Sequence, residues 1–236
     1  VEDAAAGVDA ALAAGMRAIG IGPEERVGHA HLRFDDLKDV TPGDLRAGLA
    51  DASWILAEPS LDPASLHHKE TIFTTGNGNF CVRGSFEEGY PGETAAGFMH
   101  RLWDDIPINF TELANLPHWV GIDLWVSGVR FRLDRGEVLN YHRSLDMHTG
   151  ILSRRVRWRP AAEGPVLDLY FERFADFSHP HRAAVCLQVR VLAGSAEIRL
   201  RTGLSVHVEN LGVVHWVLQE QEVTPDAVAV LVRTRS

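Results

Sequence analysis

Apolar and polar residues alternate one by one along several stretches of the chain. A period of two is typical of strands with one buried face and one wetted face. The arginines at the alternate positions are expected on the wetted face. Turn residues separate the stretches, which favours antiparallel sheets packed as a sandwich. The stretches are Ile122–Val126, Val129–Leu133, Val185–Val191, Ala196–Arg201 and Val228–Val232.

The alternation also predicts which side chains are buried. In the third stretch we expect one face of the strand to point inward, with Cys186 on the opposite face. Cys81 lies in a similar strand-like segment. Two cysteines make no disulfide framework, so buried thiols in a reducing cytoplasm are the simplest interpretation. The inward positions of the third stretch are Val185, Leu187, Val189 and Val191.

The first fifty residues have a different pattern. Ala4–Met16 is alanine-rich and predicts a helix that stops at Gly15. Short apolar strands are expected at Arg17–Gly22 and His31–Phe34, and Thr41-Pro42 marks the start of another helix. This order predicts an α/β piece that is too short to bury a full core alone. We therefore expect a domain boundary near residue 51, with one unit over residues 1–50 and a β domain over residues 51–236.

Composition narrows the function classes. The net charge of −9 and the isoelectric point near 5.7 argue against nucleic acid and anionic membranes as partners. No apolar run approaches the roughly 20 residues that a membrane helix needs. The chain begins at Val1 without a methionine, and the strand after Val228 stops without a closing element. We interpret it as an internal piece of a longer cytoplasmic polypeptide, with its β domain incomplete at the C-terminus.

The most specific string of the chain runs from Thr74 to Gly89. Asn77-Gly78 within it predicts a hairpin with a type I′ turn. The string resembles the N-terminal signature of glycoside hydrolase family 65, the disaccharide phosphorylases, approximately E-x-(x)-F-x-x-G-N-G-x-x-G-V-R-G-x-F-E-E-G. Cys81 stands where the family usually has glycine. The matching positions are Glu70, Phe73, Gly76, Asn77, Gly78, Val82, Arg83, Gly84, Phe86, Glu87, Glu88 and Gly89.

Further strings follow the family in order over roughly residues 52–236, and several strings in register are more specific than any one. The resemblance implies a β-sandwich that precedes an (α/α)₆ barrel and braces it. It also implies inverting phosphorolysis of an α-glucosyl disaccharide, with inorganic phosphate as co-substrate, to β-glucose 1-phosphate. The catalytic glutamate of the family lies in the barrel, so we expect no catalytic or cofactor-binding residue here. The strings are Asn115–Trp119, Tyr141–Arg154, Arg173-Phe174, Thr202–Leu204 and Glu209–Trp216.

The N-terminal string Val1–Val8 resembles the C-terminal end of β-phosphoglucomutase, in the haloacid dehalogenase superfamily. That resemblance implies that Glu2 and Asp3 are ligands of Mg²⁺, a hard cation that prefers oxygen donors. An isolated Glu-Asp pair is also a common helix N-terminus. The parent would then be a fusion of the mutase with a family 65 phosphorylase, and the two would catalyse consecutive steps.

Other candidate residues give weaker indications of a function. Glu87-Glu88 is expected to have a structural role, and Asp104-Asp105 to form a solvated turn, since adjacent side chains of a strand or turn point apart. The twelve histidines show no zinc spacing. The tryptophans are expected in a sandwich core or an interdomain seam rather than against sugar rings.

Two alternative functions stay open beside that of a phosphorylase. One is a non-catalytic carbohydrate-binding or interaction module. The other is a hydrolytic relative that uses water in place of phosphate. The disaccharide, whether trehalose, maltose or kojibiose, is not specified by the sequence. A homodimer through the β-sandwich is implied by the resemblance, with a disaccharide and phosphate as small-molecule partners.

Overall fold

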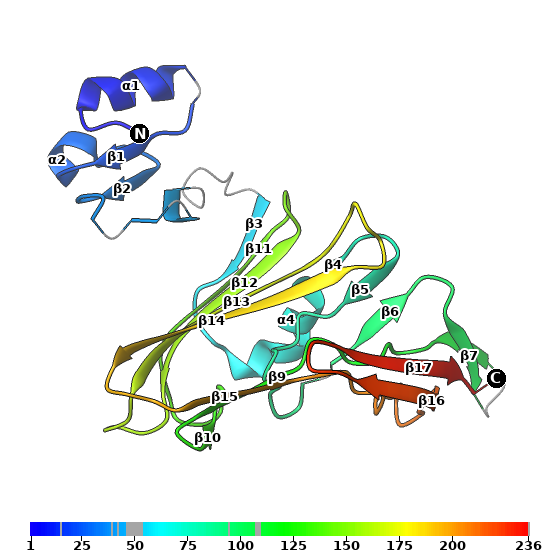
Figure 1. Cartoon of the computed structure of the whole chain (residues 1–236). Helices are drawn as coiled ribbons and strands as arrows, with labels where there is room; N and C mark the ends of the chain where they lie inside the picture. The colour runs from blue at the N-terminus through cyan, green and yellow to red at the C-terminus, as the bar shows by residue number, and fades with distance from the viewer. Residues whose placement is uncertain are drawn as a thin grey trace. The chain divides into compact units, whose positions relative to one another are not determined.

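The computed structural model describes residues 1–14, 16–38, 40–41, 43–45, 54–93, 95–106 and 110–235. The chain divides into two compact units, Val1–Ile55 and Leu56–Ser236 (Figure 1). The predicted boundary at residue 51 lies outside the described residues and stays a prediction. No helix of the described part is long and apolar enough to cross a bilayer.

The described part of the smaller unit includes the helices α1 and α2 and a short parallel sheet. The two strands pair in parallel, with Ile19 opposite Leu32. Buried Val8, Ala18 and Val27 pack together between the elements. The predicted helix over Ala4–Met16 is confirmed in a shorter form, whereas its stop at Gly15 lies outside the described residues. The elements are α1 (Ala5–Ala13), β1 (Ile19–Ile21), α2 (Glu24–Val27) and β2 (Leu32–Phe34).

The helix predicted from Thr41-Pro42 falls largely outside the described residues. Its first turn is marked by a reciprocal contact, in which Thr41 N donates to Asp44 Oδ2 at 2.8 Å and Asp44 N donates to Thr41 Oγ1 at 3.3 Å. Such reciprocal bonds are typical of helix N-termini.

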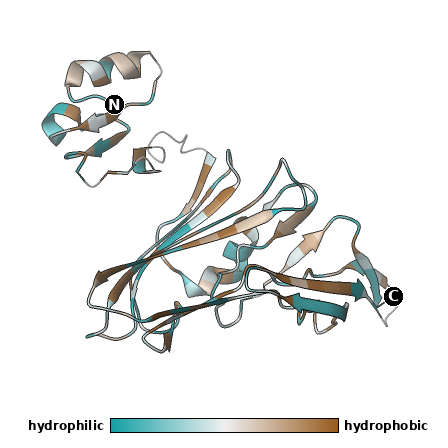
Figure 2. Ribbon diagram, in the orientation of Figure 1, coloured by the Kyte–Doolittle hydropathy of each residue, from teal (hydrophilic) through white to brown (hydrophobic). Residues whose placement is uncertain are grey.

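The larger unit is built on a five-stranded sheet of order β14-β13-β12-β11-β3. The pairs β11–β12, β12–β13 and β13–β14 are antiparallel. Figure 2 shows apolar and polar residues alternating along these long strands, as a sheet with one buried face requires. The strands are β3 (Ile55–Glu58), β11 (Glu137–Asp146), β12 (Ile151–Arg159), β13 (Val166–Ala175) and β14 (Ala183–Ala193).

A three-stranded sheet of order β10-β9-β15 forms the opposite layer. The main core joins the two layers: Leu124 and Val126 of β9 belong to the same buried cluster as Trp158 of β12 and Phe171 of β13. The mainly β, antiparallel architecture is therefore confirmed. The strands of this layer are β9 (Ile122–Val126), β10 (Val129–Arg130) and β15 (Ile198–Thr202).

Shorter elements complete the unit. A three-stranded sheet of order β4-β5-β6 and the hairpins β7–β8 and β16–β17 are all antiparallel. The elements are η2 (Pro63–Ser65), α4 (Leu66–Ile72), β4 (Thr75–Gly76), β5 (Phe80–Val82), β6 (Gly97–Met99), β7 (Trp103–Ile106), β8 (Phe110–Leu113), β16 (Trp216–Val223) and β17 (Val228–Thr234).

Burial along β14 differs in degree from the prediction. Val185, Leu187 and Val189 do face the core clusters but are only half-buried, and Val191 is 39% exposed. These side chains are less buried than predicted because β14 lies at the edge of its sheet and, among the described strands, pairs on one side alone. The expectation of a buried Cys186 is wrong, because Cys186 lies on the face of β14 opposite to Leu187 and its side chain is exposed. Cys81 is half-buried in β5.

Two tight turns of the larger unit differ in type. Ser127 and Gly128 have φ of 49° and 83°, as a type I′ turn requires at both central residues. The type I′ prediction at Asn77-Gly78 is wrong, because Gly78, with φ of 86°, has positive φ and Asn77 does not. Asn77 N donates instead to Phe80 O at 3.1 Å, so Gly78 and Asn79 are the central residues of this turn.

Candidate functional site

The stretch Arg83–Gly89, here called the motif loop, leaves β5 and passes close to the end of α4. Gly84 N donates to Glu70 O at 2.7 Å. A Cβ atom on Gly84 would lie 2.6 Å from the Cβ of Phe73, so only glycine fits this approach. The sequence thus places the acidic end of the loop, Glu87-Glu88, inside the sandwich, where Glu87 is 6% and Glu88 3% exposed.

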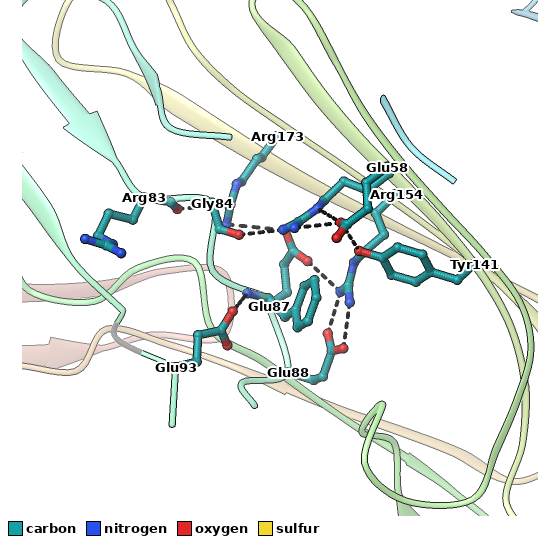
Figure 3. A network of polar contacts seen from close by, with 11 residues as sticks. Glu58, Arg83, Gly84, Glu87, Glu88, Glu93, Tyr141, Arg154 and Arg173 are labelled. Carbon is teal, nitrogen blue, oxygen red and sulfur yellow. Dashed lines mark hydrogen bonds and ion pairs between the residues drawn. The ribbon is translucent and has the colours of Figure 1, made fainter. Parts of the chain in front are cut away.

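Three buried arginines contact the motif loop. Arg143, Arg154 and Arg173 come from β11, β12 and β13, and are 2%, 3% and 1% exposed. The register places Arg143 directly opposite Arg154, and Leu152 opposite Arg173. Adjacent antiparallel strands therefore bring three guanidinium groups together on the inward face of the sheet (Figure 3).

Arg154 binds both glutamates of the loop. Its Nη2 donates to Glu87 Oε2 and its Nη1 to Glu88 Oε1, each at 2.7 Å. Its guanidinium also lies over the rings of Phe86 and Phe171, at 4.5 Å and 4.3 Å from their centroids. A planar guanidinium can satisfy two carboxylates and two aromatic faces at once, whereas an ammonium group cannot.

The other two arginines hold the start of the loop. Arg143 donates from Nε to Glu58 Oε2 at 2.8 Å and from Nη1 to Gly84 O at 2.7 Å. Tyr141 donates its hydroxyl to the same Glu58 oxygen at 2.8 Å. Arg173 Nη2 donates to the carbonyl of Arg83 at 2.9 Å. The loop is thereby fixed by side chains of three strands of the sheet.

The charged groups of this network shift one another's pKa values. Burial raises the pKa of Glu87, but Arg154 and Arg173 outweigh it, and the net shift is downward. Burial works against the charged form of Arg154, yet Glu88 and Glu87 raise its pKa. Burial lowers the pKa of Arg173 in spite of Glu87. Opposite charges in close contact favour the ionised forms, so the Arg154–Glu87 pair is held charged.

Glu93 is the exception, because burial raises its pKa to about 8 and Glu88 adds to the shift. Its Oε1 accepts a 2.6 Å bond from Phe86 N, at the centre of the motif loop. A carboxyl whose folded pKa is raised stabilises the fold below its unfolded value near 4.5 and loses that contribution as the pH rises to about 8.

We therefore expect Glu93→Gln to flatten the pH dependence of stability between about pH 5 and pH 8. Glutamine keeps an acceptor for Phe86 N but cannot ionise. The measurement is urea unfolding of both proteins at several pH values. Parallel curves for wild type and variant across this range would contradict the assignment.

A recess of about 460 Å³ opens beside the buried network. Three of the family-like strings meet in it, since its lining includes Glu87-Glu88-Gly89, His118 and Thr202-Gly203-Leu204. Asp123, on its wall, pairs with both Arg130 and Arg201. Burial and Arg173 lower the pKa of His118. The wall of the recess that His118 forms is therefore neutral, and the charged side chains lie on the other walls. A volume of this size suits a small polar ligand or an inserted side chain.

The acidic doublets behave differently from the sequence expectations. Glu87-Glu88 does have a structural role, but the two carboxylates converge on Arg154 instead of pointing apart. The solvated turn at Asp104-Asp105 is wrong, because both residues lie in β7 and Asp104 is 2% exposed. Asp104 Oδ2 lies 2.8 Å from Nδ1 of buried His215. Asp104 and His215 lie more than a hundred residues apart in the sequence, so the local pattern could not predict this pair.

The structure shows where the histidines and tryptophans of the described part lie. In the described part of the chain no group of three or more metal-ligating side chains gathers. Trp158 is fully buried, with its Nε1 donating to Arg135 O at 2.7 Å. Trp54 and Trp103 are 46% and 52% exposed, so these two lie outside the core.

Glu2 and Asp3 lie at the edge of the small parallel sheet. Glu2 pairs in parallel with Gly20, through bonds from Glu2 N to Ile19 O and from Ile21 N to Glu2 O, both at 2.8 Å. Asp3 follows directly, before α1. The Glu2 carboxylate lies against Gly7, where a Cβ would come within 2.1 Å of it. The donor set of two carboxylates suits Mg²⁺ in chemistry but supplies only part of an octahedral shell.

Sequence reasoning missed Arg143, Arg154 and Arg173 as interior residues, although a signal was present. Arg154 has the same phase in its strand as Leu152, Val156 and Trp158, which are all buried. An arginine on the apolar phase of a strand indicates a buried charge with a partner elsewhere.

The fold and the site define an antiparallel β-sandwich domain whose interior is organised around a loop held by buried arginines. Residues 56–236 match the family described as glycosyl hydrolase family 65, N-terminal domain. The chain belongs to this family, and the match covers the whole of the larger unit, Leu56–Ser236.

Individual relatives agree with this assignment. The chain is similar to a kojibiose phosphorylase of Halothermothrix orenii, 34% identical over 78% of this chain and 24% of the relative. An alpha,alpha-trehalose phosphorylase of Thermoanaerobacter brockii is 27% identical over 67% of this chain and 22% of its own length. A solved structure, a putative kojibiose phosphorylase from human microbiome, shares the fold with a TM-score of 0.71, at 17% identity over 78% of this chain and 26% of that one. The chain thus spans about a quarter of the length of these relatives.

Proposed function

We propose that residues 51–236 form the N-terminal β-sandwich of a phosphorylase that cleaves an α-linked glucosyl disaccharide with inorganic phosphate. The reaction inverts the anomeric centre and releases β-glucose 1-phosphate. The observation that carries the proposal is the match of residues 56–236 to the family 65 N-terminal domain. Kojibiose and trehalose phosphorylases among the relatives support phosphorolysis over hydrolysis.

The role of this domain is structural. The charged side chains of the motif loop are engaged with Arg154 and its neighbours, so they hold the sandwich together rather than donate a proton to a substrate. The recess beside the loop is then a surface presented to the remainder of the enzyme. The catalytic glutamate belongs to a barrel outside this chain. The protein is cytoplasmic and forms a homodimer through the β-sandwich.

The proposal extends to the first unit. Residues 1–50 would be the C-terminal piece of a β-phosphoglucomutase-like domain that converts β-glucose 1-phosphate to glucose 6-phosphate. Glu2 and Asp3 would hold Mg²⁺ there, and the ion would supply charge neutralisation at the phosphate. The parallel pairing of Glu2 with Gly20 supports this, because ligands of α/β sheets lie at the carboxyl ends of parallel strands.

The experiment assays the full-length parent protein and the 236-residue chain with trehalose, maltose and kojibiose, with and without phosphate. We expect phosphate-dependent release of β-glucose 1-phosphate from one disaccharide by the parent, and no turnover by this chain. Turnover by the isolated chain would contradict the structural role. Phosphate-independent release of glucose by the parent would favour the hydrolytic relative. Disaccharide binding by the chain, measured by calorimetry, would favour a carbohydrate-binding module.

The metal assignment is tested in the same parent protein. We expect Asp3→Asn to remove most mutase activity and leave disaccharide phosphorolysis unchanged, because the two active sites are separate. Unchanged mutase turnover would contradict Asp3 as a ligand, and a loss of both activities would indicate a folding defect.

A further inference from the structure

A small cavity of about 10 Å³ lies behind the motif loop, inside the buried network. Its polar lining consists of Ser85 and Glu87 from the loop and of Arg143, Arg154 and Arg173 from the sheet. Ser85 is 2% exposed, and the three arginines are between 1% and 3% exposed. The cavity is distinct in shape from the large recess, although Glu87 contributes to both.

Several hydrogen-bond donors on this lining have no hydrogen-bonding partner among the described residues. They are Ser85 Oγ, Arg154 Nε, both Nε and Nη1 of Arg173, and Arg143 Nη2, which is in ion-pair contact with Glu58. Arg173 Nη1 lies 3.4 Å from Glu87 Oε1, which is an ion-pair contact but not a hydrogen bond. Buried donors are rarely left unsatisfied in folded proteins, because each then loses its hydration without compensation. Such a cluster indicates a small acceptor between them.

We propose that this cavity binds one water molecule, which accepts from Ser85 and Arg173 and donates to Glu87. A buried water needs two to four polar partners, and about 10 Å³ of accessible space corresponds to one water. A halide ion is larger than water and would also lie against the Glu87 carboxylate, which repels it. The lowered pKa of Arg173 agrees with a guanidinium that is incompletely paired by protein groups.

The water would add a second link between the motif loop and β13, besides the bond from Arg173 Nη2 to Arg83 O. Ser85 and Glu87 belong to the motif loop and Arg173 to β13, and Figure 3 shows Arg173 beside the loop at Gly84 and Glu87. A shared water would fix Glu87 in position, and Glu87 also forms part of the floor of the recess. The rigidity of that floor would thus depend on the water.

The direct test is a high-resolution crystal structure of the 236-residue chain. We expect one density peak within hydrogen-bond distance of Ser85 Oγ and Arg173 Nη1. A second crystal soaked in bromide distinguishes the sources of the peak. An anomalous bromide signal in the cavity would overturn the proposal in favour of an anion site, and an empty cavity would overturn it outright.

Two variants of Ser85 give a second test by urea unfolding. Ser85→Ala removes one donor and leaves room for the water, whereas Ser85→Val fills the same space with methyl groups and displaces it. We expect a lower urea midpoint for Ser85→Val than for Ser85→Ala, and crystal density for the water in the alanine variant alone. A midpoint for Ser85→Val at or above that of Ser85→Ala would mean that the methyl groups fill a dry void, which contradicts the proposal.

Discussion

Replacing Arg154 by methionine is expected to lower the free energy of unfolding by about 3–5 kcal/mol, the usual loss when one partner of a buried ion pair is removed. Methionine has a similar length and is apolar, so packing against Phe86 and Phe171 is largely kept. The loss comes from Glu87 and Glu88, two buried carboxylates that both depend on this guanidinium. Urea unfolding at neutral pH measures it.

The matched control is Arg155→Met, one residue further along the same strand. Its side chain points to the other face, is 60% exposed and lies 3.5 Å from Asp168. An exposed pair of this kind contributes about 0–1 kcal/mol. A second control adds Glu87→Gln and Glu88→Gln to Arg154→Met, which removes the uncompensated charges and should recover part of the loss. Equal losses for Arg154→Met and Arg155→Met would show that the buried network is not formed.

These two neighbouring arginines show what the sequence could predict. The period of two correctly gave the strands β9, β14, β15 and β17, and with them the mainly β fold. The assumption that strand arginines face water holds for Arg155 and fails for Arg154. The phase of Arg154 is readable from its strand, but its partners are 66 and 67 residues away in the sequence. Tertiary packing, which brings the motif loop under the sheet, decides the pairing.

Edge position is a second feature that local patterns do not contain. Leu187 and Leu169 both lie at inward positions of long strands, yet Leu187 is half-buried and Leu169 is fully buried. The difference is that β13 lies between two strands, whereas among the described strands β14 pairs with β13 alone. The order of strands in a sheet depends on long-range contacts, so the sequence predicted the face of β14 but not the extent of its burial.

The path of the motif loop also explains why residue 84 is a glycine. Its replacement is the second change for which we expect a large loss of stability. Gly84→Ala is expected to destabilise the protein at or above the upper end of the roughly 1–3 kcal/mol that overpacked cores lose. Its backbone φ is not positive, so alanine meets no dihedral strain there. The obstacle is space, because the new Cβ would lie 2.6 Å from the Cβ of Phe73 and 3.0 Å from its carbonyl oxygen. Phe73 is fully buried and has little room to shift.

Gly78→Ala is the matched control for this effect. Gly78 has φ of 86°, and nothing lies within 4 Å of an added Cβ, so its substitution meets strain without a clash. A left-handed conformation costs an alanine about 1–2 kcal/mol. Chemical denaturation of both variants should therefore rank Gly84→Ala below Gly78→Ala in stability. Because Gly84 O also accepts from Arg143 Nη1, a displaced loop would weaken that bond as well, and the loss should exceed the steric term alone. A Gly84→Ala protein as stable as wild type would mean that the loop does not pass this close to Phe73.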